Sequence, residues 1–198
     1  MLTAMLRRLG LLEWDARTNR PAATTGAMLF LSFFGACLTG LLAQIRLYIP
    51  GNPVPITGQV MAVLVCGALL GSGYGAFSQI LYVGLGMLGV PWFTGGEYGF
   101  QVLAGPTGGY LIGFVVAALV LGTTSERGKA AKSIPGQIKR MLAAVCLIYF
   151  FGVVNLIVTL QIGVAHAFAL GVVPFIAGDV VKAIMAAFFT SAVLPKDR

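Results

Sequence analysis

Asp179 and Lys182 are the acid and the base that stand in the middle of an otherwise apolar stretch near the C-terminus, Pro174-Phe-Ile-Ala-Gly-Asp-Val-Val-Lys182. Three residues apart on a helix, the two side chains emerge on the same face, so they can neutralise each other or together hold a polar solute. A charge inside a bilayer costs a few kcal/mol at least. The pair therefore indicates either a ligand site or an ion pair that only orients its helix.

The composition predicts that the elements positioning this pair are membrane helices. Of the 198 residues, 58% are hydrophobic and 10% are charged, and the mean hydropathy is +0.93, which is far too apolar for a soluble domain. Since a span needs roughly 20 apolar residues, the charge-free runs hold about six helices. We predict an all-α integral membrane protein with six transmembrane helices, at about residues 24–48, 57–71, 74–90, 105–122, 141–162 and 171–194.

The chain divides into a short leading segment and one membrane domain. Residues 1–22 are predicted to form a cytoplasmic segment at the membrane interface, anchored by Leu6, Leu9, Leu12 and Trp14. Residues 23–195 would form the six-helix domain. Within it, Gly71-Ser-Gly-Tyr-Gly75 is too short for anything except a tight hairpin between the second and third helices.

The distribution of Lys and Arg predicts the orientation. Four basic residues precede the first helix, five lie between the fourth and fifth (Arg127, Lys129, Lys132, Lys139 and Arg140), and two follow the sixth, whereas Arg46 stands alone on the opposite side. Basic residues accumulate on the cytoplasmic side. Both termini are therefore predicted to be cytoplasmic, in a cell membrane (inner or plasma membrane).

Two loops would then face outward. The segment from Arg46 to Gln59 contains three prolines, which stiffen it, so it resembles a lid or a pocket wall more than a tether. The segment from Pro91 to Ala104 carries several aromatic residues and Glu97. A pocket built from these loops and the outer part of the last helix would be open to the outside.

Ser32, Ala36 and Gly40 form a stripe of small residues at four-residue spacing in the first predicted helix. Such a stripe lets another helix approach closely. Two interpretations stay open: packing within the chain's own bundle, and a docking face for a partner membrane subunit.

Several classes of function are disfavoured. The net charge of +7 could suggest nucleic acid, but the basic residues lie beside predicted helices rather than in one patch with aromatic residues. Cys37, Cys66 and Cys146 have no spacing that suits a metal or a redox pair. Gly84–Gly89 closes an apolar helix instead of following a strand, and Gly122–Lys129 misses the spacing of a phosphate loop. We expect no enzyme, no cofactor, no metal and no nucleic acid.

Four motifs resemble one family, in the same order along the chain: Pro53-Val-Pro-Ile-Thr-Gly-Gln59, Gly89-Val-Pro-Trp-Phe-Thr-Gly-Gly96, Gly105-Pro-Thr-Gly-Gly-Tyr110 and the stretch Pro174–Lys182. They look like BioY, the biotin-specific S-components of energy-coupling factor (ECF) transporters. The resemblance covers about residues 25–194. It implies an S-component-like bundle that binds biotin with high affinity near the outer surface and mediates its uptake.

The resemblance also implies a set of site residues. Asp179 and Lys182 match the family's D-x-x-K motif and would hydrogen-bond the ureido ring of biotin. Biotin also has a valerate tail that ends in a carboxylate. We expect Arg46 to bind this carboxylate, on the ground of charge alone, because it is the cation predicted on the outer side. Further pocket-lining candidates, each of which could instead be an ordinary buried or interfacial side chain, are Gln59, Tyr82, Tyr98 and Gln101.

The expected partners are the lipid bilayer, a coupling membrane subunit and two cytoplasmic ATPases, with self-association as the other route to transport. Two further functions stay open. One is an S-component-like carrier for another small amphipathic solute. The other is a ligand-free structural membrane subunit, in which Asp179 and Lys182 would only pack.

Overall fold

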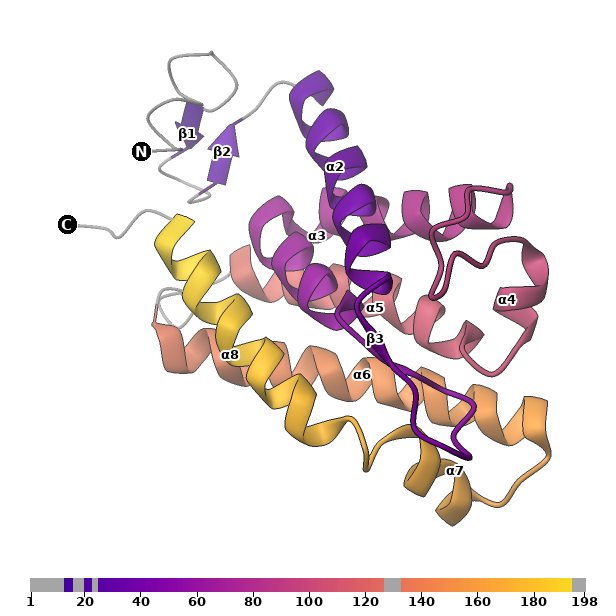
Figure 1. Cartoon of the computed structure of the whole chain (residues 1–198). Helices are drawn as coiled ribbons and strands as arrows, with labels where there is room; N and C mark the ends of the chain where they lie inside the picture. The colour runs from indigo at the N-terminus through magenta and orange to yellow at the C-terminus, as the bar shows by residue number, and fades with distance from the viewer. Residues whose placement is uncertain (1–12, 16–19, 23–24, 127–132, 194–198) are drawn as a thin grey trace.

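The computed structural model describes residues 13–15, 20–22, 25–126 and 133–193. Within these ranges the chain forms seven helices and two small two-stranded sheets (Figure 1). The helices are α2 (Thr25–Ala43), α3 (Gln59–Met87), α4 (Phe100–Ala104), α5 (Gly108–Glu126), α6 (Ile134–Leu160), α7 (Val164–Gly171) and α8 (Ile176–Val193). The strands are β1 (Glu13–Asp15), β2 (Arg20–Ala22), β3 (Arg46–Leu47) and β4 (Ile56–Thr57).

The helical prediction is confirmed for the bundle, and the two sheets are additions to it. Strand β1 pairs antiparallel with β2, and β3 pairs antiparallel with β4. The first sheet lies within the segment predicted to be interfacial, whereas its predicted anchors Leu6, Leu9 and Leu12 lie outside the described residues. The second sheet closes the proline-containing loop between α2 and α3 into a hairpin.

Four helices among the described residues are long and apolar enough to cross a membrane, namely α2, α3, α6 and α8. The apolar part of α5, Gly108–Thr124, is shorter. These lengths and compositions support a multi-pass membrane protein, which agrees with the prediction at that level. The predicted count of six crossings depends on how α3 and α5 are counted.

Helix α3 is two helices joined at Gly71. Gly71 has φ 83° and ψ −175°, which breaks the helical path and suits a residue without a Cβ. A β-carbon placed at Gly75 would lie 2.9 Å from the carbonyl oxygen of Cys66 and 3.0 Å from Cα of Gly67. In a straight helix eight residues advance roughly 12 Å, so residues 67 and 75 meet only because the chain folds back between them. The predicted tight hairpin is confirmed.

The structure corrects two loop predictions. Helix α6 begins at Ile134, so the predicted loop at 123–140 ends about seven residues too late. The signal for this start is local: the side chain of Ser133 accepts a hydrogen bond from the backbone of Gly136 (3.2 Å), and a proline occupies the first helical turn. Two short helices, α4 and α7, stand where connections were expected, and α7 contains His166.

The helices pack closely around α3 and α5, with α2 against α3 and α8 across α3 and α6 (Figure 1). Glycine allows the close approaches: a β-carbon at Gly113 of α5 would lie 2.9 Å from Cα of Ile148 of α6, and one at Gly67 would lie 3.0 Å from Cα of Ala118. Small residues at such crossings are typical of membrane bundles, where close van der Waals packing holds helices together.

The β3–β4 hairpin, α4 and α7 gather at one end of the bundle, on the right-hand side of Figure 1. Hydrogen bonds fasten these segments to one another. Asn52 of the hairpin donates to the carbonyl oxygen of Leu170 (2.9 Å), and Tyr110 of α5 donates to that of Gly171 (2.8 Å). Asn155 of α6 donates to the carbonyl oxygen of Gly105 (2.9 Å). Segments distant in sequence are thereby held together around a common space.

Candidate functional site

That space is a cavity whose wall contains residues from almost every segment at this end of the bundle. Together with the open space at its mouth, it contains about 840 Å³ that protein atoms do not fill. The hairpin contributes Tyr48, Pro53, Val54, Pro55 and Thr57; the loop after α3 contributes Phe93, Thr94 and Glu97; the helices contribute Gln59, Val60, Tyr82, Val102, Tyr110, Leu111, Phe114, Ile148, Tyr149, Asp179 and Lys182, with Thr107 and Phe175 just before α5 and α8.

Asp179 and Lys182 form an ion pair in this wall. Nζ of Lys182 lies 2.7 Å from Oδ1 of Asp179, and the two residues share one face of α8, as their spacing predicts. Asp179 is 2% exposed, while the lysine side chain remains 16% exposed. The paired charges offset the cost of desolvating each other, so the pair can present an acceptor and a donor to a ligand without a net charge.

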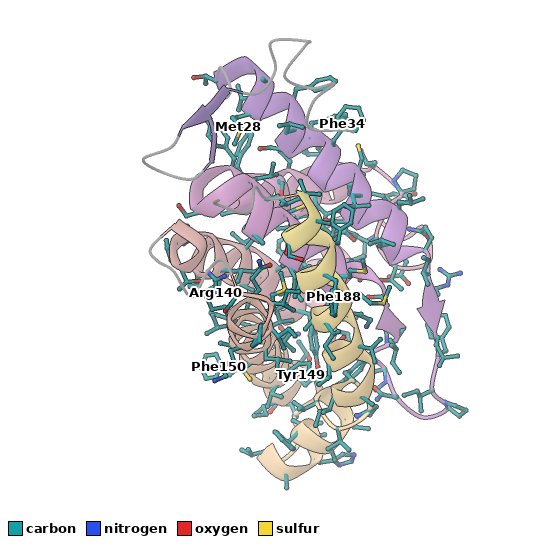
Figure 2. All side chains as sticks on the ribbon, turned by 90° about the vertical axis from the view of Figure 1, so that its left-hand side faces the viewer. Met28, Phe34, Arg140, Tyr149, Phe150 and Phe188 are labelled. Carbon is teal, nitrogen blue, oxygen red and sulfur yellow. The ribbon has the colours of Figure 1, made fainter. Side chains whose placement is uncertain are left out.

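Tyr149 of α6 completes this group from the neighbouring helix. Its hydroxyl donates a hydrogen bond of 2.7 Å to Oδ2 of Asp179, and Figure 2 shows its side chain between α6 and α8. The carboxylate therefore accepts one bond on each oxygen, from Lys182 and from Tyr149. A carboxylate oxygen can accept about two hydrogen bonds, which leaves capacity on both oxygens for a ligand's N–H groups.

Gln59 ties the two outer loops together on another side of the cavity. Its Oε1 accepts hydrogen bonds from the hydroxyls of Thr57, in the hairpin (2.8 Å), and Thr94, in the loop after α3 (3.2 Å). Its Nε2 donates to the hydroxyl of Tyr82 (2.7 Å). One buried side chain thus joins both loops to the second half of α3.

Aromatic residues fix the loop after α3 against the bundle. Phe93 is 1% exposed and meets Tyr82 edge to face, with ring centroids 5.4 Å apart. The centroid of the Trp92 ring lies 5.4 Å from that of the Tyr82 ring, and the indole N–H of Trp92 donates a hydrogen bond to the carbonyl oxygen of Tyr82 (2.9 Å). Gln44, next to the end of α2, donates to the carbonyl oxygens of Trp92 and Phe93 (3.1 Å each). The cavity wall is therefore anchored to α2 as well as α3.

Of the seven predicted ligand-binding residues, four line the cavity together: Gln59, Tyr82, Asp179 and Lys182. The other three lie outside its wall. Arg46 is exposed, and its guanidinium carbon lies 5.5 Å from the ring centroid of Tyr48. The Arg46 side chain fills the space into which a β-carbon on Gly95 would project. Tyr98 and Gln101 line a depression beside the cavity, which shares Pro53, Glu97, Val102 and Thr107 with the cavity wall.

The small-residue stripe of α2 faces the inside of the chain's own bundle. Ser32 and Ala36 are fully buried, and the Ser32 hydroxyl donates to the carbonyl oxygen of Tyr74 (3.1 Å). A β-carbon at Gly40 would lie 3.1 Å from Cβ of Trp92. These contacts favour intramolecular packing, and docking of a partner through these three residues stays a prediction.

Tyr149 is the main site residue that sequence reasoning missed. It stands in an apolar run without a polar neighbour at helical spacing, so only the packing of α6 against α8 brings it to Asp179. Its one signal is a phenol group in the middle of a membrane helix, where a buried hydroxyl needs a partner. Among the described residues no group of three His, Cys, Asp or Glu side chains could hold a metal ion.

Comparisons with known proteins agree in the family they point to. The model of the BioY family matches residues 16–196. A biotin transporter BioY of Rhizobium etli is 33% identical over 179 residues, which covers 86% of this chain and 94% of the relative. That of Thermotoga maritima is 38% identical over 139 residues, covering 70% and 80%. The solved S-component for biotin from an ECF-type ABC transporter superposes with a TM-score of 0.81 at 27% identity, covering 89% of this chain and 96% of that one.

Proposed function

Because the chain belongs to the BioY family, we propose that it is a high-affinity biotin-binding membrane subunit that mediates biotin uptake. It is a transporter subunit rather than an enzyme. The observation that carries the proposal is the ion pair of Asp179 and Lys182 in the wall of a cavity at one end of the bundle. The relatives are named biotin transporters, and the similar solved structure is an S-component for biotin.

The polar ring of biotin is proposed to bind at this pair. The ureido group offers one carbonyl oxygen, which accepts hydrogen bonds, and two N–H groups, which donate them. An ammonium donates to the carbonyl and a carboxylate accepts from the N–H groups, so Lys182 and Asp179 supply both complements. The Tyr149 hydroxyl holds the carboxylate from the opposite side, which supports a fixed orientation for the acceptor.

The valerate tail is proposed to run toward the mouth of the cavity. Pro53, Val54 and Pro55 give the cavity wall an apolar surface that suits the methylene groups of the tail. Arg46 stacks on Tyr48, which itself lines the cavity, so the guanidinium is one side chain removed from the wall. There it would attract the tail carboxylate and offset the negative charge of Glu97. Tyr98 and Gln101, beside the mouth, are proposed to contact the tail or its entry path.

The topology and partners are also part of the proposal. Counting α3 as two crossings, together with α2, α5, α6 and α8, gives six. The basic residues Lys139 and Arg140 lie near the start of α6 and Arg46 lies at the cavity end, which supports a cytoplasmic side opposite the cavity and cytoplasmic termini. The proposed location is a cell membrane, inner or plasma. A coupling membrane subunit and two ATPases, as in an ECF transporter, would supply energy, and self-association is the alternative.

Isothermal titration of the purified protein tests the function. Biotin and a panel of other small vitamins are titrated into detergent-solubilised, monodisperse protein after any ligand that co-purifies has been identified by mass spectrometry. Biotin is expected to bind with one site per chain, far more tightly than the other compounds. Tight binding of a different solute would assign another cargo, and the absence of any bound or binding solute would leave a structural role.

A further inference from the structure

The depression beside the cavity carries polar groups that binding of free biotin does not fully use. It lies between the β3–β4 hairpin, the loop after α3 and helix α4, at the end of the bundle where Figure 1 shows α4. Tyr98 and Gln101 belong to its wall. Four residues line both this depression and the cavity, so the two spaces adjoin: Pro53, Glu97, Val102 and Thr107. We call the depression the outer subsite.

Glu97 is an exposed acid in the part of the wall that the two spaces share. Its backbone is fixed, because its carbonyl oxygen accepts a hydrogen bond from the backbone N–H of Phe93 (3.1 Å), a residue that is 1% exposed. Its carboxylate makes no ion pair or hydrogen bond with any residue that the structure describes. A negative charge that a ligand can contact therefore stands at the boundary between the cavity and the outer subsite.

Arg46 brings the opposite charge to the same rim. Its guanidinium group lies where a β-carbon on Gly95 would project, and Gly95 lines the outer subsite two residues before Glu97. Within the described part of the chain, Arg46 and Glu97 form no ion pair with each other. The guanidinium carbon lies over the ring of Tyr48 instead, 5.5 Å from its centroid. The rim thus offers a cation and an anion at separate positions, each to a group of opposite charge.

Free biotin can use only one of these two charges. Its tail ends in a single carboxylate, which Arg46 attracts and Glu97 repels. When that carboxylate is bound as an amide its charge is gone, and an amino acid joined through the amide supplies an ammonium for Glu97 and a carboxylate for Arg46. Gln101 adds a polar contact: its Nε2 donates to the carbonyl oxygen of Tyr98 (2.6 Å), and its Oε1 remains as an acceptor for an N–H group.

We infer that the outer subsite binds the amino-acid end of a biotinyl amide, so that the protein accepts biotin joined through its tail to the side chain of lysine as well as free biotin. The inference rests on the proposed function, because the polar ring must bind at Asp179 and Lys182 for the tail to reach the mouth. It widens the class of ligand from the free acid to an amide that carries both charges of an α-amino acid.

Isothermal titration of the purified full chain at low ionic strength tests the inference with biotin and four amides of its tail. The methylamide adds no charge. The amide of cadaverine adds only an ammonium, and the amide of 6-aminohexanoate adds only a carboxylate. The amide of the lysine side chain, biocytin, adds both on the same length of chain. We expect biocytin to bind at least about threefold more tightly than the methylamide, a modest gain because exposed ion pairs are weak.

Two variants separate the two charges. Glu97→Gln is expected to weaken binding of biocytin and of the cadaverine amide at least about threefold relative to the methylamide, and to strengthen binding of free biotin because a repulsion is removed. Glu97→Asp is the matched control, since it keeps the carboxylate and should keep the order of affinities. Arg46→Gln is expected to weaken binding of biocytin and of the aminohexanoate amide instead. Raising the ionic strength should reduce both effects.

The possible failures are distinguishable. Binding of biotin without binding of biocytin would overturn the inference and leave the proposed function intact. Equal affinities for biocytin and the methylamide, in the unmodified protein and in Glu97→Gln alike, would also overturn it, because the amino acid would then lie in solvent outside the subsite. If folded, monodisperse protein does not bind biotin, the proposed function is wrong, and the inference is wrong with it.

Discussion

The hydroxyl of Tyr149 donates a hydrogen bond of 2.7 Å to Oδ2 of Asp179, the carboxylate oxygen opposite the one that Lys182 contacts. The bond crosses from α6 to α8, so it fixes the acceptor from a second helix. Tyr149→Phe keeps the ring and removes the donor. Since a hydrogen bond to a charged group contributes about 1.5–3 kcal/mol, we expect biotin to bind at least about tenfold more weakly, measured by isothermal titration.

Tyr74→Phe is the control for this change. It also removes a tyrosine hydroxyl, but Tyr74 lies outside the cavity wall. It should bind biotin like the unmodified protein. An unchanged affinity in Tyr149→Phe would mean that the lysine alone positions the carboxylate.

Gly40 of α2 packs against Trp92, whose neighbour Phe93 lines the cavity. Gly40→Leu would force Trp92 away, because a β-carbon alone would already lie 3.1 Å from the tryptophan side chain. We expect a lower melting temperature and weaker biotin binding, since overpacking costs about 1–3 kcal/mol. Gly26→Leu is the matched control: it makes the same change on the same helix where nothing lies within 4 Å. If Gly40→Leu instead binds biotin normally but no longer assembles with a coupling subunit, the stripe is a docking face.

How far the sequence predicts the site depends on whether its residues share an element. Asp179 and Lys182 were identified as a pair because their spacing on one helix decides that they share a face. The hairpin at Gly71 was likewise predictable, since five residues cannot connect two spans in any other way. Both predictions use local geometry, which a sequence contains.

Contacts between elements were harder to predict. Tyr149 reaches Asp179 only through the crossing of α6 and α8, which no spacing within either helix reveals. The same reason explains why the sequence does not decide which neighbour the stripe of Ser32, Ala36 and Gly40 packs against. Small residues allow another helix to approach closely, but the sequence does not say whether that helix is α3 or belongs to another protein. Charge alone predicts the side of the membrane on which Arg46 lies, and that orientation stays a prediction. The position of its guanidinium group depends on Tyr48 and Gly95, which charge does not reveal.

Gln59 connects the hairpin and the loop after α3 through Thr57 and Thr94. Gln59→Leu keeps the size of the side chain but leaves these hydroxyls and that of Tyr82 without this partner. Because the two loops would then move independently, we expect biotin to dissociate at least about fivefold faster, as a loss of about 1 kcal/mol would give, in stopped-flow displacement with unlabelled biotin. A dissociation rate equal to that of the unmodified protein would show that the loops do not need this connection.

The orientation can be tested by labelling single cysteines in intact cells. In a background with Cys37, Cys66 and Cys146 changed to Ala, Pro50→Cys lies in the exposed turn of the hairpin at the cavity end, and Gly128→Cys lies in the basic sequence between α5 and α6. A membrane-impermeant maleimide is expected to label residue 50 directly and residue 128 only after permeabilisation, because basic loops stay in the cytoplasm. The reverse pattern would place the cavity on the cytoplasmic side and overturn the proposed outward-facing pocket.

The final prediction is that Asp179 and Lys182 bind the polar ring of biotin as a unit. Removing one member of a buried pair leaves the other charge without its partner, which costs about 3–5 kcal/mol in comparable cases. Asp179→Asn keeps the shape and one acceptor, and we expect at least about a tenfold loss of affinity, or about 1.4 kcal/mol; Lys182→Ala should lose at least as much. If the residues act together, the double variant should be little worse than the poorer single variant, because the second change then removes a charge that is already unpaired. Isothermal titration on monodisperse protein measures all three, and affinities equal to that of the unmodified protein in both single variants would reduce the 2.7 Å ion pair to a structural contact within α8.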